Sequence, residues 1–550
     1  MIKRKSLLTI GFSNRGIGKI VREKLWYGVA IALGMQVAVT PAIAAERITL
    51  KLGAFESAIA ISELEQFAKT GKLPQKLQLY SAFLTPQVQK VLNSRLQVDP
   101  QQADKYISEL SSSPYGKQLL KYLGVAIPDL TLPQLQAAVS LAAQQANGVS
   151  VVSLIKAYPQ ENIVIDASSA IALAVEFNPS YLQSQAVGSS LESKLAVTSS
   201  TKFKPSFDPA KMGKATVLEQ TIVFNNRQRD RSIPVDIYYS QQNLVSSLRP
   251  TPLVVISPGL GANRQFFSYL ARHLASYGLT VAALEHPSPT RNLSNVNSPN
   301  QLLPATEFIN RPKDISFVLD ELSKLDRQPG RLQGKLNTQT VSVIGHSLGG
   351  YTALALAGGE LNLQQLRQAC KNANPLAQAP ADWLQCGAAS LIDSKVQLQD
   401  KRVKNAIALN PVVGQLFGEN GLNKIDIPVL ILASTEDAIT PVLNHQLRPF
   451  NQLNNQKYLV TAIGGTHLSV GNPSSQAFSD RTRIKERRGV EVQPLRQLIS
   501  GVSLAFINQL TPQAQIYQPF LTPAYAQSLS TSSLPLRLST ELPESAIARP

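Results

Sequence analysis

The chain has 550 residues, of which 43% are hydrophobic and 16% are charged, and its formal net charge is +17. This composition excludes a wholly disordered chain, and the presence of only two cysteines excludes a small scaffold held together by disulfides. The length predicts two to four domains, or one large domain with additions. The positive charge points to nucleic-acid or membrane binding only if it is concentrated in one place.

Residues 1–45 hold a large share of that charge, because seven Lys or Arg residues oppose Glu23 and give +6. An apolar run, Trp26–Gly34, follows, and the segment closes with an Ala-x-Ala pattern. A basic start, an apolar middle and a small-residue end are typical of a secretory signal peptide. We therefore predict cleavage after Ala44 or Ala45 and an exported protein, periplasmic or secreted. A retained segment would instead associate the protein with the membrane.

The remaining charge is spread over the rest of the chain, so we predict no nucleic-acid partner. One basic run late in the chain predicts a solvated face, with peripheral contact to an anionic membrane surface as the alternative. Its members are Arg481, Arg483, Lys485, Arg487 and Arg488. The sequence has no H-E-x-x-H, C-x-x-C or G-x-x-x-x-G-K pattern, so we expect neither a metal nor another cofactor.

Residues 46–175 are predicted to form a smaller, mainly α-helical domain of unknown function. Helix signals recur along it, such as the capping pattern Ser62–Glu65 with Gly71 as a stop. Two alternating stretches, Ile48–Leu52 and Ile163–Ile165, indicate short strands that can pair and close the unit.

The segment 176–215, rich in Ser, Gln, Lys and Pro, is predicted to be a linker. Strands then alternate with helices over 216–510, which predicts a doubly wound, mostly parallel α/β sheet. Its central strands are continuous apolar runs, as expected for strands covered on both faces. They are Leu253–Ile256, Thr280–Leu284, Val341–Ile344, Ala406–Leu409 and Val429–Leu432. The Pro- and Ser/Thr-rich stretch 511–550 is predicted to be a flexible tail.

A G-x-S-x-G motif, Gly345–Gly349, lies between the strand at Val341–Ile344 and a helical run at Tyr351–Ala357. In this context the motif forms a sharp turn that exposes the serine at the edge of the sheet. We therefore predict Ser347 as a nucleophile, with Gly345 and Gly349 as the glycines that the turn requires. The alternative is a Gly-rich turn with an incidental serine.

A serine nucleophile needs a base, and in this architecture the chain order is serine, acid, histidine. That order leaves His445, in an expected helix, and His467, in a loop after the apolar stretch Tyr458–Val460. We favour His467 as the base, the alternative being a surface histidine without a role. The loop after Val429–Leu432 offers the acid.

Asp437 is the preferred acid because a short loop can hold it to orient the histidine. Glu436 is the second choice, and a solvated turn is the alternative for either residue. Two backbone N–H groups should stabilise an oxyanion. We assign them to Leu348 and to Leu260, the latter in the glycine-containing loop after the first central strand. His286 and His346 are candidate pocket residues, with a hydrogen-bonded loop pair as the alternative for His286.

Cys370 and Cys386 lie in the segment Gly358–Lys395, a candidate cap over the pocket. Export would favour a disulfide between them. Two buried free thiols are the alternative, because the sequence does not show whether the geometry allows a bond.

Several segments together resemble the α/β-hydrolase superfamily and, within it, the platelet-activating-factor acetylhydrolase and predicted dienelactone hydrolase group. They are Ser257–Gly261, Leu274–Gly278, Val281–His286 and Gly345–Ala353. The resemblance covers 216–510 and implies a serine esterase that acts on lipid or other carboxylic esters without a metal. Pro258 departs from the pattern, because the animal acetylhydrolases carry His there.

Residues 46–175 resemble the uncharacterised domain that precedes such hydrolases in cyanobacteria, and this resemblance implies no activity. The expected function is an exported serine hydrolase with a small-molecule or lipid ester as substrate. An acyltransferase that uses the same site on a lipid, sugar or carotenoid acceptor is an alternative. A non-catalytic envelope binding protein on a hydrolase scaffold is another.

Overall fold

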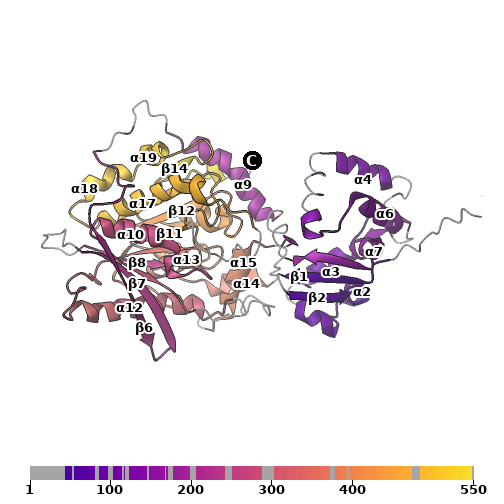
Figure 1. The fold of residues 1–550 in the computed structure, drawn as a ribbon, viewed down its shortest axis with the longest axis horizontal. Coiled ribbons are helices and arrows are strands. Elements are labelled where there is room, and N and C mark those ends of the chain that lie inside the picture. Colours follow the sequence, from indigo (N-terminus) through magenta and orange to yellow (C-terminus); the bar gives the residue numbers. More distant parts are fainter. Residues whose placement is uncertain are drawn as a thin grey trace, which may run out of the picture.

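A computed structural model describes residues 44–547 apart from short internal stretches, the longest being 171–177, 242–250, 288–302, 372–377 and 473–483. The expected signal peptide therefore lies almost wholly outside the described residues. Figure 1 shows a small lobe formed by the N-terminal part and a large lobe formed by the rest. Within the described ranges, no helix combines the length and the apolar character needed to cross a bilayer.

The small lobe contains a three-stranded sheet in which β1 (Arg47–Leu52) lies between β2 (Phe55–Ala60) and β5 (Asn162–Asp166). β1 runs parallel to β5, the pairing allowed by the sequence, and antiparallel to β2. β2 was not expected, because its Ser-Ala-Ile-Ala end lacks the bulky residues typical of strands. The remaining elements are α2 (Ile61–Thr70), η1 (Gln75–Tyr80), α3 (Pro86–Asn93), β3 (Arg95–Leu96), α4 (Ala103–Ser112), α6 (Leu132–Ala143), β4 (Val149–Ser150) and α7 (Val151–Lys156).

The large lobe is built on a nine-stranded sheet in the order β14-β13-β12-β11-β10-β8-β9-β7-β6. Strands β13 to β9 in this order are parallel, and the three others are antiparallel to their neighbours. The expected doubly wound, mostly parallel sheet is thus confirmed. The strands are β6 (Val217–Asn226), β7 (Arg231–Ser240), β8 (Leu253–Ser257), β9 (Thr280–Leu284), β10 (Val341–His346), β11 (Val403–Leu409), β12 (Val429–Ser434), β13 (Lys457–Ala462) and β14 (Leu536–Ser539).

Helices cover both faces of this sheet, because successive side chains of a strand point to opposite faces. Val254 and Ile256 pack with α10 (Ser268–Ser276) and α17 (Gln493–Asn508) in one core. Leu253 and Val255 belong to the opposite core, with α12 (Glu307–Asp326) and α13 (Leu348–Leu356). The shorter elements are η2 (Arg264–Phe267), α14 (Leu363–Cys370), α15 (Pro380–Leu384), η4 (Gln385–Ser390), η5 (Leu422–Lys424), the π-helical turn η6 (Leu443–Leu447), α16 (Arg448–Gln452) and η8 (Gly489–Val492).

The predicted linker is partly a helix of the large lobe, so that boundary is corrected. α9 (Pro179–Lys194) begins at Asn178, whose side chain accepts hydrogen bonds from the first amides of the helix. Its residues Val187 and Leu191 are buried in the same core as residues of α12 and α13. Further along, Phe207 packs edge-on against Phe520. Burial of these apolar side chains outweighs the polar composition of the segment.

The predicted flexible tail is also wrong, because this segment completes the sheet. It forms α18 (Ala514–Tyr517), η9 (Gln518–Phe520), α19 (Pro523–Ser528), β14 and α20 (Glu544–Ile547). β14 pairs antiparallel with β13, and Leu536 and Leu538 are buried in the core of α10 and α17. Its prolines open short helices, at Pro519 and Pro523, where a missing N–H has no cost.

Candidate active site

Ser347 occupies a strained turn between β10 and α13, with φ of 56° and ψ of −119°. Non-glycine residues rarely adopt this backbone conformation, which persists only where the surroundings enforce it. The two glycines of the motif are sterically required. A Cβ on Gly345 would lie 1.9 Å from the carbonyl oxygen of Gly349, and one on Gly349 would lie 2.1 Å from that of Ser257. The turn therefore has the geometry expected of a nucleophile elbow.

His467 and Asp437 meet in the loops after β13 and β12, the neighbouring parallel strands. The Nδ1 atom of His467 lies 2.7 Å from Oδ2 of Asp437, and both side chains are buried. Asp437 also accepts the backbone N–H groups of Ile439 and Thr440, at 2.9 and 2.7 Å, and the hydroxyl of Thr440 at 2.7 Å. This set of donors stabilises the carboxylate and fixes its orientation toward the imidazole.

The environment of His467 shifts its proton affinity upward. Burial lowers the pKa, but the charge of Asp437, its hydrogen bond and the charge of Glu486 together outweigh burial, so the pKa of His467 lies above its usual value. An imidazole that is stabilised when protonated suits a general base that must hold a proton during a reaction.

His346, a candidate pocket residue, holds the His467 loop. Its Nε2 atom lies 3.0 Å from the carbonyl oxygen of His467, and the two ring centroids are 4.6 Å apart. Burial and the nearby His467 lower the pKa of His346 well below its usual value, so its ring is neutral and Nε2–H is the donor. Asn410 donates to the same carbonyl at 3.1 Å. These contacts bring His467 close to the elbow.

Ser347 Oγ makes no hydrogen bond with His467 among the described residues, so this link is open in the structure. Such bonds are often long before substrate binds. The loop Ser257–Gly261 lies against the serine, since a Cβ on Gly259 would be 3.1 Å from that of Ser347. Leu260 follows in this loop, and Leu348 is the first residue of α13, where amides have no partner within the helix. Both candidate oxyanion donors thus flank the nucleophile.

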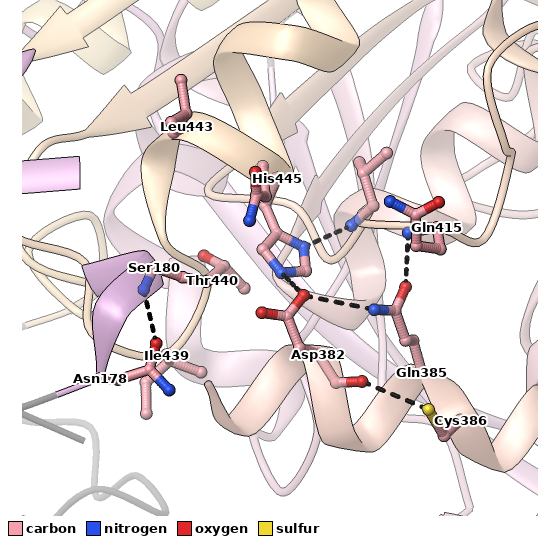
Figure 2. A network of polar contacts seen from close by, with 12 residues as sticks. Asn178, Ser180, Asp382, Gln385, Cys386, Gln415, Ile439, Thr440, Leu443 and His445 are labelled. Atoms are coloured by element: carbon pink, nitrogen blue, oxygen red, sulfur yellow. Dashed lines mark hydrogen bonds and ion pairs between the residues drawn. The ribbon is translucent and has the colours of Figure 1, made fainter. Parts of the chain in front are cut away.

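The second-choice residues have other partners. His445 is buried, accepts the N–H of Val413 at its Nδ1 atom and bonds Oδ1 of Asp382 through Nε2, both at 3.1 Å (Figure 2). His445 therefore links η6 to α15, and it makes no contact among those described with the Asp437–His467 pair. Glu436 is only half-buried, and among the described contacts its neighbour Asp437 is the residue that bonds the His467 ring.

Both ring nitrogens of His286, a candidate pocket residue, have hydrogen-bond partners. It is buried, and its Nε2 and Nδ1 atoms lie 3.0 Å from Ser257 Oγ and 3.1 Å from Asp314 Oδ2. The hydrogen-bonded loop pair, the alternative considered for it, describes it better.

The candidate cap segment forms α14, α15 and η4, and Cys370 and Cys386 are joined by a disulfide with a Cα–Cα distance of 5.6 Å. The bond links the end of α14 to η4. The N–H of Ala381 donates to the carbonyl of Ile439 at 3.0 Å, two residues after Asp437. The segment therefore packs on the acid loop.

Sequence reasoning missed Glu486, because it stands within a basic run that predicts a solvated face. Its Oε2 atom accepts the N–H of Leu468 at 2.9 Å, next to His467. Burial raises the pKa of Glu486 above its usual value. A lone acid in a basic run, shortly after the histidine loop, was the available signal. Arg481 and Arg483 of that run lie outside the described residues.

Replacing Glu486 by glutamine should lower the pKa of His467, because a negative charge that favours the imidazolium is removed. A histidine that acts as a general base must be neutral, so with His467 in that role activity should fall as the pH drops through its pKa. The acid limb of kcat/KM should therefore move to lower pH in E486Q. The pH profile of an ester substrate measures this, with E491Q as a control in the same segment. An unmoved limb, or one moved upward, would contradict the role given to Glu486.

The described residues contain no cluster of three or more side chains suited to hold a metal ion. The mostly parallel nine-stranded sheet with helices on both faces has the α/β-hydrolase fold, and the elbow and the buried Asp437–His467 pair follow its strands β10, β12 and β13.

Two family models match the chain. The model for "Alpha/beta hydrolase of unknown function (DUF1400)" matches residues 44–166, and the model for "Platelet-activating factor acetylhydrolase, isoform II" matches residues 232–301. The first match covers the small lobe, and the second covers β8, the loop with Leu260 and β9. No curated protein matches the chain. The resemblance expected from the sequence is thereby confirmed, and the chain is a hydrolase with the α/β-hydrolase fold.

Proposed function

We propose that the protein is an exported serine hydrolase that cleaves carboxylic esters, with lipid or other small acyl esters as substrates. The observation that carries this proposal is the 2.7 Å contact between His467 and Asp437, beside a serine on a strained elbow. The similarity to an acetylhydrolase family over the first strands supports ester bonds as the target.

Ser347 Oγ attacks the ester carbonyl, and His467 Nε2 takes the hydroxyl proton, while Asp437 holds Nδ1–H and stabilises the imidazolium. The oxygen that becomes negative is bound by the amides of Leu260 and Leu348. His467 then gives the proton to the leaving alkoxide, which departs as the alcohol. Water attacks the acyl-enzyme, His467 takes its proton, and the acid is released as Ser347 regains its hydrogen.

Two features support export. Residues 1–45 have the basic, apolar and Ala-x-Ala pattern of a signal peptide. The Cys370–Cys386 disulfide suits an oxidising compartment, since cytosolic thiols are kept reduced.

The test is covalent labelling of the folded chain, begun at residue 46, with a fluorophosphonate, and S347A as the control. We expect one label on Ser347 and none in the variant. The same preparations would be assayed on p-nitrophenyl esters of graded length, phospholipids and galactolipids, with and without an acceptor alcohol. Absence of labelling while a control esterase reacts would reject the proposal. An ester product formed only with the added alcohol would reveal acyl transfer instead.

A further inference from the structure

A second Ser–His–Asp chain lies behind the oxyanion loop. Ser257 Oγ is 3.0 Å from His286 Nε2, and His286 Nδ1 is 3.1 Å from Asp314 Oδ2. The three residues come from the end of β8, the loop after β9 and the middle of α12. We propose that they form a positioning relay that holds the loop Pro258–Gly261 in place for oxyanion binding. The inference rests on the proposed function.

The direction of each hydrogen bond follows from the charges around the relay. Asp314 also accepts from Arg231 at 2.7 Å and from Arg229 at 2.8 Å, which favour its ionised form. Burial lowers the pKa of His286, with Arg311 and Arg231 adding to the effect against Asp314, so the ring is neutral. Its Nδ1–H therefore donates to the carboxylate, and its Nε2 lone pair accepts the Ser257 hydroxyl.

Ser257 is too enclosed to act as a second nucleophile. Its side chain is fully buried, and its carbonyl oxygen occupies the space where Gly349 would carry a Cβ. In the sheet it pairs with Gly345 of β10. The relay therefore ends on a residue that contacts both glycines of the elbow and directly precedes the oxyanion loop.

α12 contacts the next residue of the loop as well. The Nη1 atom of the buried Arg311 donates to the carbonyl of Pro258 at 3.0 Å. Arg311 and Asp314 are three positions apart and so lie on the same face of the helix. That face is braced by Arg231, which binds both Asp314 and, at 2.6 Å, Glu307. α12 thus holds two consecutive residues, Ser257 through His286 and Pro258 directly.

The consequence for catalysis is selective. An oxyanion donor contributes only when its N–H is already placed where negative charge develops. It therefore lowers the free energy of the transition state more than that of the bound substrate. The loop contains Gly259 and Gly261, which restrict the backbone least. The relay therefore fixes the backbone conformation that these glycines leave free. Loss of the relay should lower kcat and leave KM nearly unchanged.

The test uses S257A in the full chain, which removes one hydroxyl and leaves the arginine–carboxylate cluster intact. The control is S316A, on the same helix, whose hydroxyl donates to Asp400 at 2.7 Å away from the loop. We expect kcat to fall by about 10-fold or more in S257A, with KM within about 2-fold of the unaltered protein. S316A should keep both constants.

Hydrogen exchange of the peptide that spans 257–263 provides a readout that needs no catalysis. It should be faster in S257A and unchanged in S316A. Unchanged exchange in S257A would overturn the relay, and so would a loosened loop with unaltered kcat. If the unaltered protein is neither labelled by a fluorophosphonate nor active on esters, the proposed function fails, while the exchange result still decides whether the relay orders the loop.

Discussion

Replacing Ser347 by glycine should raise the free energy of unfolding by about 1 kcal/mol while lowering kcat by about 10⁶-fold. The gain arises because φ of 56° and ψ of −119° are strained for serine and accessible to glycine. Relief of about 1–3 kcal/mol of strain is partly offset by the greater entropy of glycine in the unfolded chain. Denaturant midpoints and an ester assay measure the two effects.

Ser342 provides the matched control, because it is buried on β10, the strand that leads into the elbow, and has no positive φ. The same change there, S342G, should lower the free energy of unfolding by about 1 kcal/mol, since glycine weakens a strand interior. If S347G were destabilised as much as S342G, the strained elbow would not store the energy assigned to it.

A chain ended after Leu510 should fail to yield a soluble, folded hydrolase. The truncation removes β14, so β13 loses one of its two neighbours and becomes an edge strand. It also removes fully or nearly fully buried side chains, namely Phe520, Leu521, Tyr525, Leu534, Leu536 and Leu538. At about 1.5–3 kcal/mol for each of these six side chains, the loss is about 9–18 kcal/mol, which is as large as the whole stability of a typical domain, about 5–15 kcal/mol.

A chain ended after Leu542 is the control, because it is also shortened but keeps β14 and the buried side chains named above. It keeps β14 and loses only α20, whose Ser545 carbonyl accepts from Lys194. This variant should fold, with a lower denaturation midpoint measured by circular dichroism. A stable, active protein ended at 510 would show that the tail contributes little.

The parts of the fold that could be predicted are those encoded by contiguous residues. Each central strand is an unbroken apolar run. The five residues Gly345–Gly349 include both glycines that the close packing of the elbow requires. His467 was preferred to His445 because it follows a strand. In the structure it is His467 that contacts Asp437.

The parts that could not be predicted depend on contacts between distant segments. Phe207 and Phe520 belong to stretches whose composition indicates loops, and only their contact buries them. Asp314 meets Arg231 across 83 positions of sequence, a pairing that no local pattern reveals. For the same reason Glu486 looked like part of a solvated face.

α9 has a mechanical consequence for the small lobe. The first turn of the helix carries Tyr181, which packs with Ala438, Ile439 and Ile484, and Figure 2 shows Asn178 and Ser180 beside the loop of Ile439 and Thr440. Farther along, Lys194 ties the helix to the carbonyl of Ser545. The N-terminal end of α9 is thus anchored at the acid loop. A force that the small lobe exerts along the chain therefore reaches the large lobe next to Asp437.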